Sequence, residues 1–146
     1  IVDVRKKSAE LKGVILAFKK SKTRMPAIVG DEAAIKIAIN NLLDNAINYT
    51  SKGGKVNVSM AKTDSALEIH VADTGIGIPK EDMEHIFTKF FRGKDATKII
   101  TDGTGLGLYI AKRIIELHGG DIWAQSQSGE SSTFGIRFPV EASLRL

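Results

Sequence analysis

The sequence predicts an α+β two-layer sandwich, in which a mixed, largely antiparallel sheet of about five strands carries helices on one face. Two observations lead to this prediction. Helical and strand-like patterns alternate along the 146 residues, and the strand-like segments come in pairs joined by short turns. A chain of this length buries roughly 70% of its unfolded surface. We therefore expect a single domain over residues 1–146 with a proper core.

The N-terminal segment predicts a short amphipathic helix at residues 3–14, followed by a strand at 15–20. The apolar positions of this helix are Val4, Leu11 and Val14. A connector with Pro26 and Gly30 then leads to Asp31, whose side chain suits the N-cap of a second helix at 32–50. The apolar face of that helix is marked at helical spacing by Ile35, Ile39, Leu42, Leu43 and Ala46.

The rest of the chain predicts two strand pairs separated by a helix–loop–helix segment. The helix after the long loop has apolar positions at Ile110, Ile114 and Leu117, and the pair Gly119 and Gly120 ends it. The predicted elements, in order, are strands at 56–60 and 66–72, a short helix at 79–87 that begins with Pro79, a long loop at 88–108, a helix at 107–120, and strands at 121–127 and 132–140.

Composition excludes several classes of protein. The chain has no cysteine, which rules out disulfides, thiol catalysis and cysteine-based zinc sites. No apolar stretch approaches the roughly 20 residues of a membrane-spanning helix. The net charge is +4, but basic and acidic residues are interleaved, which argues against a nucleic-acid-binding surface. A mildly basic protein could equally prefer an anionic small ligand. The chain does not begin with Met, and we expect it to be a piece of a longer protein.

The second predicted helix carries a stripe of short polar side chains, which are Asn40, Asn41, Asp44, Asn45 and Asn48. Asn and Asp are poor helix formers, and a solvated face would more cheaply use Lys, Glu or Gln, so the stripe indicates a site. Asn41 and Asn45 are four residues apart and project from one face. Their amide oxygens could ligate Mg²⁺, which often shares its ligands with phosphates. A polar helix face without any ligand is the alternative.

Two glycine-rich segments flank predicted elements. DTGIGI follows a strand that ends in Asp73, and DGTGLGL precedes a helix. Glycines let backbone N–H groups approach a ligand, and the N-terminus of a helix favours anions. The second segment is neither a P-loop nor the dinucleotide-binding fingerprint, because its spacing departs from both. Each segment alone is also compatible with a structural turn.

Taken in order, these segments resemble the catalytic and ATP-binding domain of sensor histidine kinases, which shares a superfamily with the gyrase, Hsp90 and MutL ATPases. NNLLDNAINYT resembles the N box, DTGIGI the first glycine box and IFTKFFR the F box. DGTGLGLYIAKRIIELHGG resembles the second glycine box with its helix, and GESSTFGIRFP the final strand pair. The resemblance covers about residues 31–140 and implies the Bergerat ATP-binding fold.

The resemblance implies a role for each matched residue. Asp73 would accept a hydrogen bond from the adenine amine, and a carboxylate, which only accepts, would meet guanine's carbonyl with repulsion. Asn41 and Asn45 would ligate Mg²⁺, and with Arg92 they are the implied catalytic residues. The implied nucleotide-binding residues are Asn45, Asn48, Tyr49, Asp73, Gly75, Gly77, Ile78, Phe87, Arg92, Gly103, Thr104, Gly105, Leu106, Gly107, Leu108 and Thr133.

Two further features follow from the resemblance. Residues 93–102 would form a lid over the nucleotide, anchored by Phe87, Phe90 and Phe91, and we expect the lid to be mobile because of its glycines and polar character. Many family members carry Lys at the position of Asn48, which puts one phosphate contact in doubt.

Position 41 separates kinase from ATPase. In the ATPases of the superfamily, a glutamate at this position activates water, and the amide of Asn41 cannot act as a general base. We therefore expect the chain to bind ATP with Mg²⁺ and to donate the γ-phosphate to a histidine in two-component signalling. None of the histidines, His70, His85 and His118, lies in an acceptor setting, so we expect no autophosphorylation by this chain alone.

The implied partners, besides ATP, are the histidine-bearing dimerisation domain of the same homodimeric kinase and a response regulator. The resemblance implies a cytoplasmic domain of a membrane-bound sensor kinase, which would contact the membrane only through another part of the protein. It implies no nucleic-acid partner. Three alternatives stay open. They are a module that phosphorylates serine or binds ATP only as a switch, a gyrase-type ATPase, and a non-catalytic binding module.

Overall fold

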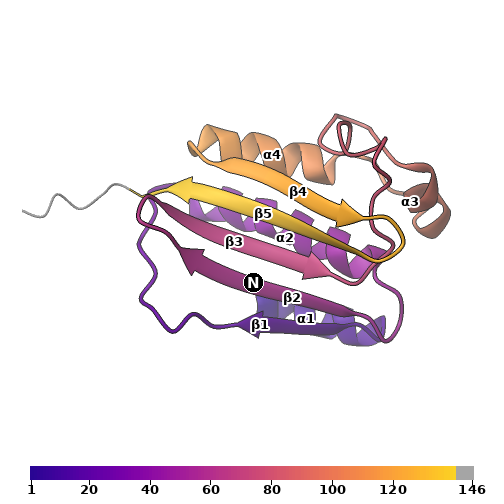
Figure 1. The fold of residues 1–146 in the computed structure, drawn as a ribbon, viewed down its shortest axis with the longest axis horizontal. Helices are drawn as coiled ribbons and strands as arrows, with labels where there is room; N and C mark the ends of the chain where they lie inside the picture. Colours follow the sequence, from indigo (N-terminus) through magenta and orange to yellow (C-terminus); the bar gives the residue numbers. More distant parts are fainter. Residues whose placement is uncertain (141–146) are drawn as a thin grey trace, which may run out of the picture.

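The computed structural model describes residues 1–140, and its five strands form one sheet in the order β1-β2-β3-β5-β4. The last residues of the predicted domain, 141–146, lie outside the described residues. The elements are α1 (Val2–Leu11), β1 (Ile15–Lys19), α2 (Glu32–Tyr49), β2 (Lys55–Lys62), β3 (Ala66–Asp73), α3 (Lys94–Ile99), α4 (Gly107–Leu117), β4 (Asp121–Gln127) and β5 (Ser131–Pro139). Strand β1 runs parallel to β2, and the other neighbours are antiparallel. Helices α1, α2 and α4 lie on one side of the sheet (Figure 1), which confirms the predicted two-layer α+β fold.

Helix α2 is the centre of the core. The side chain of Asp31 accepts a hydrogen bond of 3.0 Å from the backbone N–H of Ala34, as predicted for the N-cap. Leu42, Leu43 and Ala46 are completely buried on the predicted apolar face, whereas Ile39 is only partly buried. Each such leucine contributes roughly 1.5–3 kcal/mol of hydrophobic stabilisation. The burial of this face fixes how α2 is turned on the sheet.

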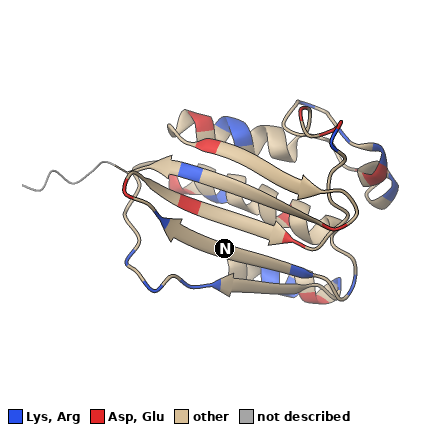
Figure 2. Cartoon of the chain, viewed as in Figure 1, with Lys and Arg blue, Asp and Glu red and all other residues tan. Residues whose placement is uncertain are grey.

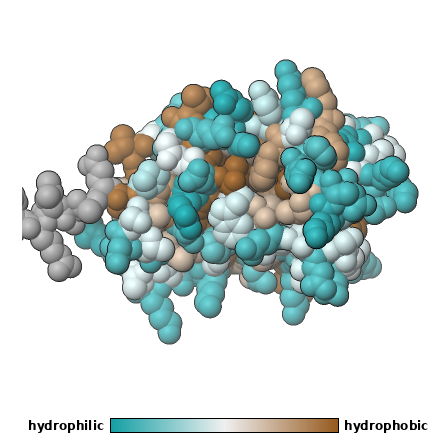
Figure 3. All heavy atoms as spheres, turned by 45° about the horizontal axis from the view of Figure 1, so that its top comes forward, coloured by the Kyte–Doolittle hydropathy of each residue, from teal (hydrophilic) through white to brown (hydrophobic). Residues whose placement is uncertain are grey.

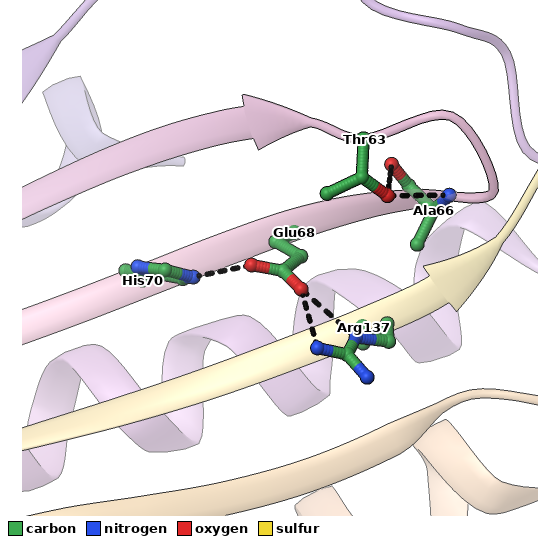
Figure 4. Close-up of polar contacts among 5 residues, drawn as sticks. All are labelled: Thr63, Ala66, Glu68, His70 and Arg137. Carbon is green, nitrogen blue, oxygen red and sulfur yellow. Dashed lines mark hydrogen bonds and ion pairs between the residues drawn. The ribbon is translucent and has the colours of Figure 1, made fainter.

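The face of the sheet opposite the helices carries a cross-strand cluster. The Nε–H of Arg137 on β5 donates a hydrogen bond of 2.8 Å to Oε1 of Glu68 on β3, and the Nη2 of Arg137 forms an ion pair of 2.7 Å with the same oxygen. His70 lies 3.1 Å from the other oxygen of Glu68, so Glu68 sits between the two (Figure 4). The hydrogen bond from Arg137 holds the pKa of Glu68 below its ordinary value. The edge of the Trp123 ring meets His70, with ring centroids 5.4 Å apart.

Charges of both signs are spread over helices and strands (Figure 2). The basic residues of the segment after β1 are Lys20, Lys22 and Arg24. The surface seen with the top of Figure 1 turned forward is mostly hydrophilic, with apolar residues gathered toward the upper part of the view (Figure 3). Among residues 1–140, no helix is both long and apolar enough to cross a membrane.

Two of the three apolar positions predicted for the first helix are wrong, whereas Val14, which follows the end of α1, is buried in the core. Val4 and Leu11 are 76% and 82% exposed, and the buried residue of the helix is Ala9. The reason is that α1 turns charged side chains toward α2. Arg5 forms an ion pair of 3.1 Å with Asp44, and Lys12 contacts the end of α2, so the inward face does not appear as an apolar pattern.

The segment between β3 and α4 also differs from the prediction. Residues 79–87 form successive turns rather than an α-helix, because their backbone hydrogen bonds join residues three apart, as from the N–H of Asp82 to the carbonyl of Pro79, and not four apart. The predicted loop at 88–108 contains the six-residue helix α3. In α4, Ile110 and Leu117 are exposed, and the buried residues are instead Ala111 and Ile115. Helix α4 packs against α2, and the small side chain of Ala111 is completely buried.

Gly135 on β5 is required by the single tryptophan. A Cβ built at this glycine would lie 2.1 Å from the Trp123 ring, so Gly135→Ala forces the indole away from the sheet. We expect a loss of about 1–3 kcal/mol in the free energy of unfolding, as for other overpacked sites, and a red shift of the tryptophan fluorescence. Urea unfolding followed by fluorescence measures both. Thr133→Ala is the control on the same strand, and unchanged fluorescence and stability in Gly135→Ala would contradict the described packing.

Candidate functional site

A cavity of about 260 Å³ lies between the polar face of α2, the loop after β3 and the segment leading into α4. Most of the predicted site residues line it. Those found in its wall are Asn41, Asn45, Asn48, Tyr49, Asp73, Gly77, Ile78, Arg92, Gly103, Thr104, Gly105, Gly107 and Leu108. The structure therefore brings together residues from four separate segments of the chain.

The wall formed by α2 consists of short polar side chains. Asn41, Asp44, Asn45 and Asn48 follow one another at helical spacing and all line the cavity, while the opposite face of α2 is core. Among residues 1–140, no group of three His, Cys, Asp or Glu side chains could hold a metal ion. A cation here would depend on amide oxygens together with ligand phosphates and water, a donor set that suits Mg²⁺. Asn41 and Asn45 fit this requirement.

Asp73, the last residue of β3, brings a buried carboxylate to the cavity. Its side chain is 6% exposed and accepts a hydrogen bond of 2.9 Å from the backbone N–H of Gly75. Burial raises the pKa of Asp73 to about 6, although hydrogen bonds from the backbone of Gly75 and Ser132 oppose the rise. Asp73 is thus a buried hydrogen-bond acceptor, and the pKa of its carboxyl group lies close to neutral pH.

The glycines after Asp73 are required by close packing. A Cβ at Gly75 would lie 2.5 Å from the carbonyl oxygen of Tyr49 and 2.7 Å from a carboxylate oxygen of Asp73. Gly77 has φ of +66°, and a Cβ there would lie 2.1 Å from the carbonyl oxygen of Gln127. The loop is therefore pressed against the β4–β5 turn on one side, while the backbone at Gly77 stays exposed to the cavity on the other.

Arg92 and the glycines near α4 form the opposite wall. The guanidinium of Arg92 donates to the backbone carbonyls of Ile100 and, at 3.0 Å, Thr101. A Cβ at Gly103 would lie 3.0 Å from this guanidinium. Gly107 begins α4, and a Cβ there would lie only 3.9 Å from the side chain of Asn41. The N-terminus of α4, which favours anions, therefore faces the amides of α2 across the cavity.

Comparison with known families identifies this arrangement. The model of the family described as histidine kinase-, DNA gyrase B- and HSP90-like ATPases matches residues 30–142. The chain belongs to this family.

Relatives and solved structures of the family point to sensor kinases. A sensor-like histidine kinase, SenX3 of Mycolicibacterium smegmatis, is 45% identical over 112 residues, which are 77% of this chain and 29% of SenX3. The sensor histidine kinase WalK of Bacillus subtilis is 40% identical over 113 residues, 76% of this chain and 18% of WalK. The chain thus spans less than a third of these relatives.

Two solved structures share the fold. The catalytic domain of the histidine kinase ThkA superposes with a TM-score of 0.78 at 28% identity, covering 94% of this chain and 87% of that domain. Full-length ShkA, solved in complex with AMPPNP, gives a TM-score of 0.80 at 26% identity, covering 97% of this chain and 29% of ShkA.

Four residues predicted from the family resemblance are not in the cavity wall, and these are Gly75, Phe87, Leu106 and Thr133. Gly75 contributes from outside the cavity wall, because its backbone N–H donates a hydrogen bond to the carboxylate of Asp73. The rings of Phe87 and Phe134 pack edge to face, with centroids 6.2 Å apart, so the partly buried Phe87 packs against the core. Leu106 occupies the N-cap position of α4.

Ser132, which the sequence analysis missed, takes the place predicted for Thr133. Neighbouring residues of a strand point to opposite faces, and Ser132 is the one that is buried, pairs with Asp73 across β3 and β5, and lines the cavity. Asp44 was likewise not among the predicted site residues. Its helical spacing to Asn41 and Asn48 was the available signal.

Asp73→Asn is expected to stabilise the free protein at neutral pH. Because the folded-state pKa of about 6 lies above the value of 3.8 for a free aspartate, the folded state holds more protons between these values, and stability falls as pH rises through them. Asparagine cannot ionise, so we expect a gain of about 1–3 kcal/mol in the free energy of unfolding at pH 7.5, and a smaller gain at pH 4.5.

Urea unfolding at the two pH values measures this difference. Asp64→Asn in the exposed turn between β2 and β3 is the matched control, because asparagine is equally suited to turns. If Asp73→Asn is less stable than the wild-type chain at pH 7.5, the buried carboxylate does not lower the stability of the folded protein, and the prediction is wrong.

Proposed function

We propose that this chain binds ATP with Mg²⁺ and donates the γ-phosphate to a histidine on a separate dimerisation domain, as the catalytic domain of a sensor histidine kinase. The observation that carries the proposal is the buried carboxylate of Asp73, which lines the same cavity as the amide stripe of α2. Its first support is family membership, and its second is the likeness to a kinase solved with AMPPNP.

Asp73 suits recognition of adenine. Its ionised carboxylate only accepts hydrogen bonds, so it matches an exocyclic amine and repels the carbonyl oxygen that guanine has at the same place. The apolar side chains of Ile78, Ile86 and Phe91 line the same cavity and could enclose a planar base. When the wrong base leaves a buried polar group of such a site without its hydrogen-bond partner, the site rejects that base by several powers of ten.

The other end of the cavity suits phosphates. The N-terminus of α4 with Gly105 and Gly107 offers backbone N–H groups, and Arg92 offers a guanidinium whose partners are neutral carbonyls. Asn41 and Asn45 would hold Mg²⁺ between α2 and the phosphates. Bound there, Mg²⁺ would neutralise part of the charge of the transferring phosphoryl group, and the task of the protein residues would be to align that group with its acceptor.

The cavity favours a kinase over an ATPase. Asn41 cannot accept a proton from water. The nearby carboxylate of Asp44 is the one feature that favours a hydrolase, since it lines the cavity and its burial raises the pKa of its carboxyl. However, one oxygen of Asp44 is engaged by Arg5 at 3.1 Å, and an ion pair with a guanidinium makes a carboxylate a weaker base.

Since the chain spans less than a third of its named relatives, the activity of the whole protein belongs to the proposal. We infer that residues 1–146 form one domain of a longer, homodimeric kinase. The acceptor histidine would lie on its dimerisation domain, the phosphate would pass to a response regulator, and this domain would work in the cytoplasm. A serine acceptor is the alternative within the same chemistry.

Calorimetric titration with ATP and GTP, each with and without Mg²⁺, tests the nucleotide site. We expect ATP to bind at least about 100-fold more tightly than GTP, and Asp73→Asn to abolish this preference. Asn45→Ala should remove the gain in affinity that Mg²⁺ gives and leave the affinity for adenosine unchanged. Equal affinities for ATP and GTP in the wild-type chain would refute the proposed adenine site.

Phosphate release from ATP tests kinase against hydrolase. We expect the chain alone to release phosphate no faster than Asp44→Asn, because neither Asp44 nor Asn41 activates water. Steady turnover that is lost in Asp44→Asn would instead identify an ATPase with Asp44 as its base.

A further inference from the structure

The cavity carries more negative than positive charge. Among the described residues, the wall holds four carboxylates but one cationic side chain, that of Arg92. Arg5 and Lys98, which are not in the wall, form ion pairs with two of these carboxylates, and the other two have no ion-pair partner among residues 1–140. The carboxylates are Asp44, Asp73, Asp82 and Asp95. A nucleoside triphosphate adds several negative charges to this wall, and their repulsion is strong in a partly dry cavity. Further positive charge near the wall would therefore strengthen binding.

The end of α2 adds to this problem. Asn48 and Tyr49 in its last turn, and Asn45 directly before that turn, line the cavity. The last carbonyls of a helix carry a partial negative charge. The last turn of α2 has no basic residue of its own. A phosphate that approaches Asn48 is therefore repelled by the end of α2 unless a cation from elsewhere masks these carbonyls.

Lys12, which directly follows α1, provides this cation. Its ammonium donates to the carbonyl oxygens of Asn48 at 3.1 Å and Ile47 at 3.4 Å. It also lies 3.4 Å from the side-chain oxygen of Asn48. All three partners are neutral, and within residues 1–140 no carboxylate lies at ion-pair distance from Lys12, so its charge is not cancelled locally.

The contact also orients an amide. Lys12 takes up the side-chain oxygen of Asn48, which leaves the NH₂ group of this amide, a donor that suits a phosphate oxygen, for another partner. Because Asn48 lines the cavity, we expect this donor to be available to a phosphate there.

We propose that Lys12 is a positioning residue for phosphate binding. It masks the terminal carbonyls of α2 and holds the amide of Asn48 with its donor toward the phosphates. The inference rests on the proposed function, and it adds α1 and its following residue to the nucleotide site. Because Asp73 takes the base and Lys12 acts on the phosphates, the effect of Lys12 depends on the phosphates being present.

Calorimetric titration of the chain with adenosine, ADP and ATP–Mg²⁺ tests this inference. We expect Lys12→Met to weaken ATP binding roughly tenfold, the size of a charge at a helix end plus one hydrogen bond, and to leave adenosine binding unchanged. Lys12→Arg should keep most of the ATP affinity. The matched control is Lys20→Met, which removes one charge at the opposite end of β1.

Asn48→Lys in the Lys12→Met background places the cation on the cavity wall itself, and we expect it to restore ATP binding. Equal losses for adenosine and ATP in Lys12→Met would reduce Lys12 to a support of the fold, and unchanged ATP affinity would also overturn the inference. If the wild-type chain fails to prefer ATP over GTP in the titration that tests the proposed function, that function fails first, and this outcome is distinct from any result of the Lys12 variants.

Discussion

The packing of α2 on the sheet is the constraint on which the rest of the structure depends. A helix that buries Leu42, Leu43 and Ala46 completely must turn its other face outward, and that face carries the amides of Asn41 and Asn45. The loop after β3 and the start of α4 then close over these amides to form one cavity. A rotation of α2 would expose core and scatter the site, so fold and site are determined by the same contact.

The cavity concentrates features that work against stability. Asp73 is a charged group withdrawn from water, and Gly75 and Gly77 allow close contacts that no other residue permits. Outside the cavity wall, but next to its residue Phe91, the exposed Phe90 has a backbone φ of +65°. The core supplied by α2 and the sheet offsets these costs. Such a distribution is expected when a stable layer carries a site selected for binding.

The sequence was sufficient for the elements with strong periodicity and insufficient where charge or register decided the outcome. The five strands and α2 follow from alternation and helical spacing. The orientation of α1 was mispredicted because Arg5 faces inward, and α3 was missed because its six residues are too few to show a period. Ser132 was missed because only the pairing of β3 with β5 shows which neighbour points to Asp73. The family motifs supplied what periodicity could not, namely which polar residues share one cavity.

The most direct test of the account is the pKa of the Asp73 carboxyl, measured by ¹³C NMR in the free chain and with bound ATP. In the free protein we expect a value of about 6, set by burial. On binding, the adenine amine would donate to the ionised form, so the pKa should fall. An Asp73 pKa that ATP leaves unchanged would contradict the central claim that this carboxylate receives the base.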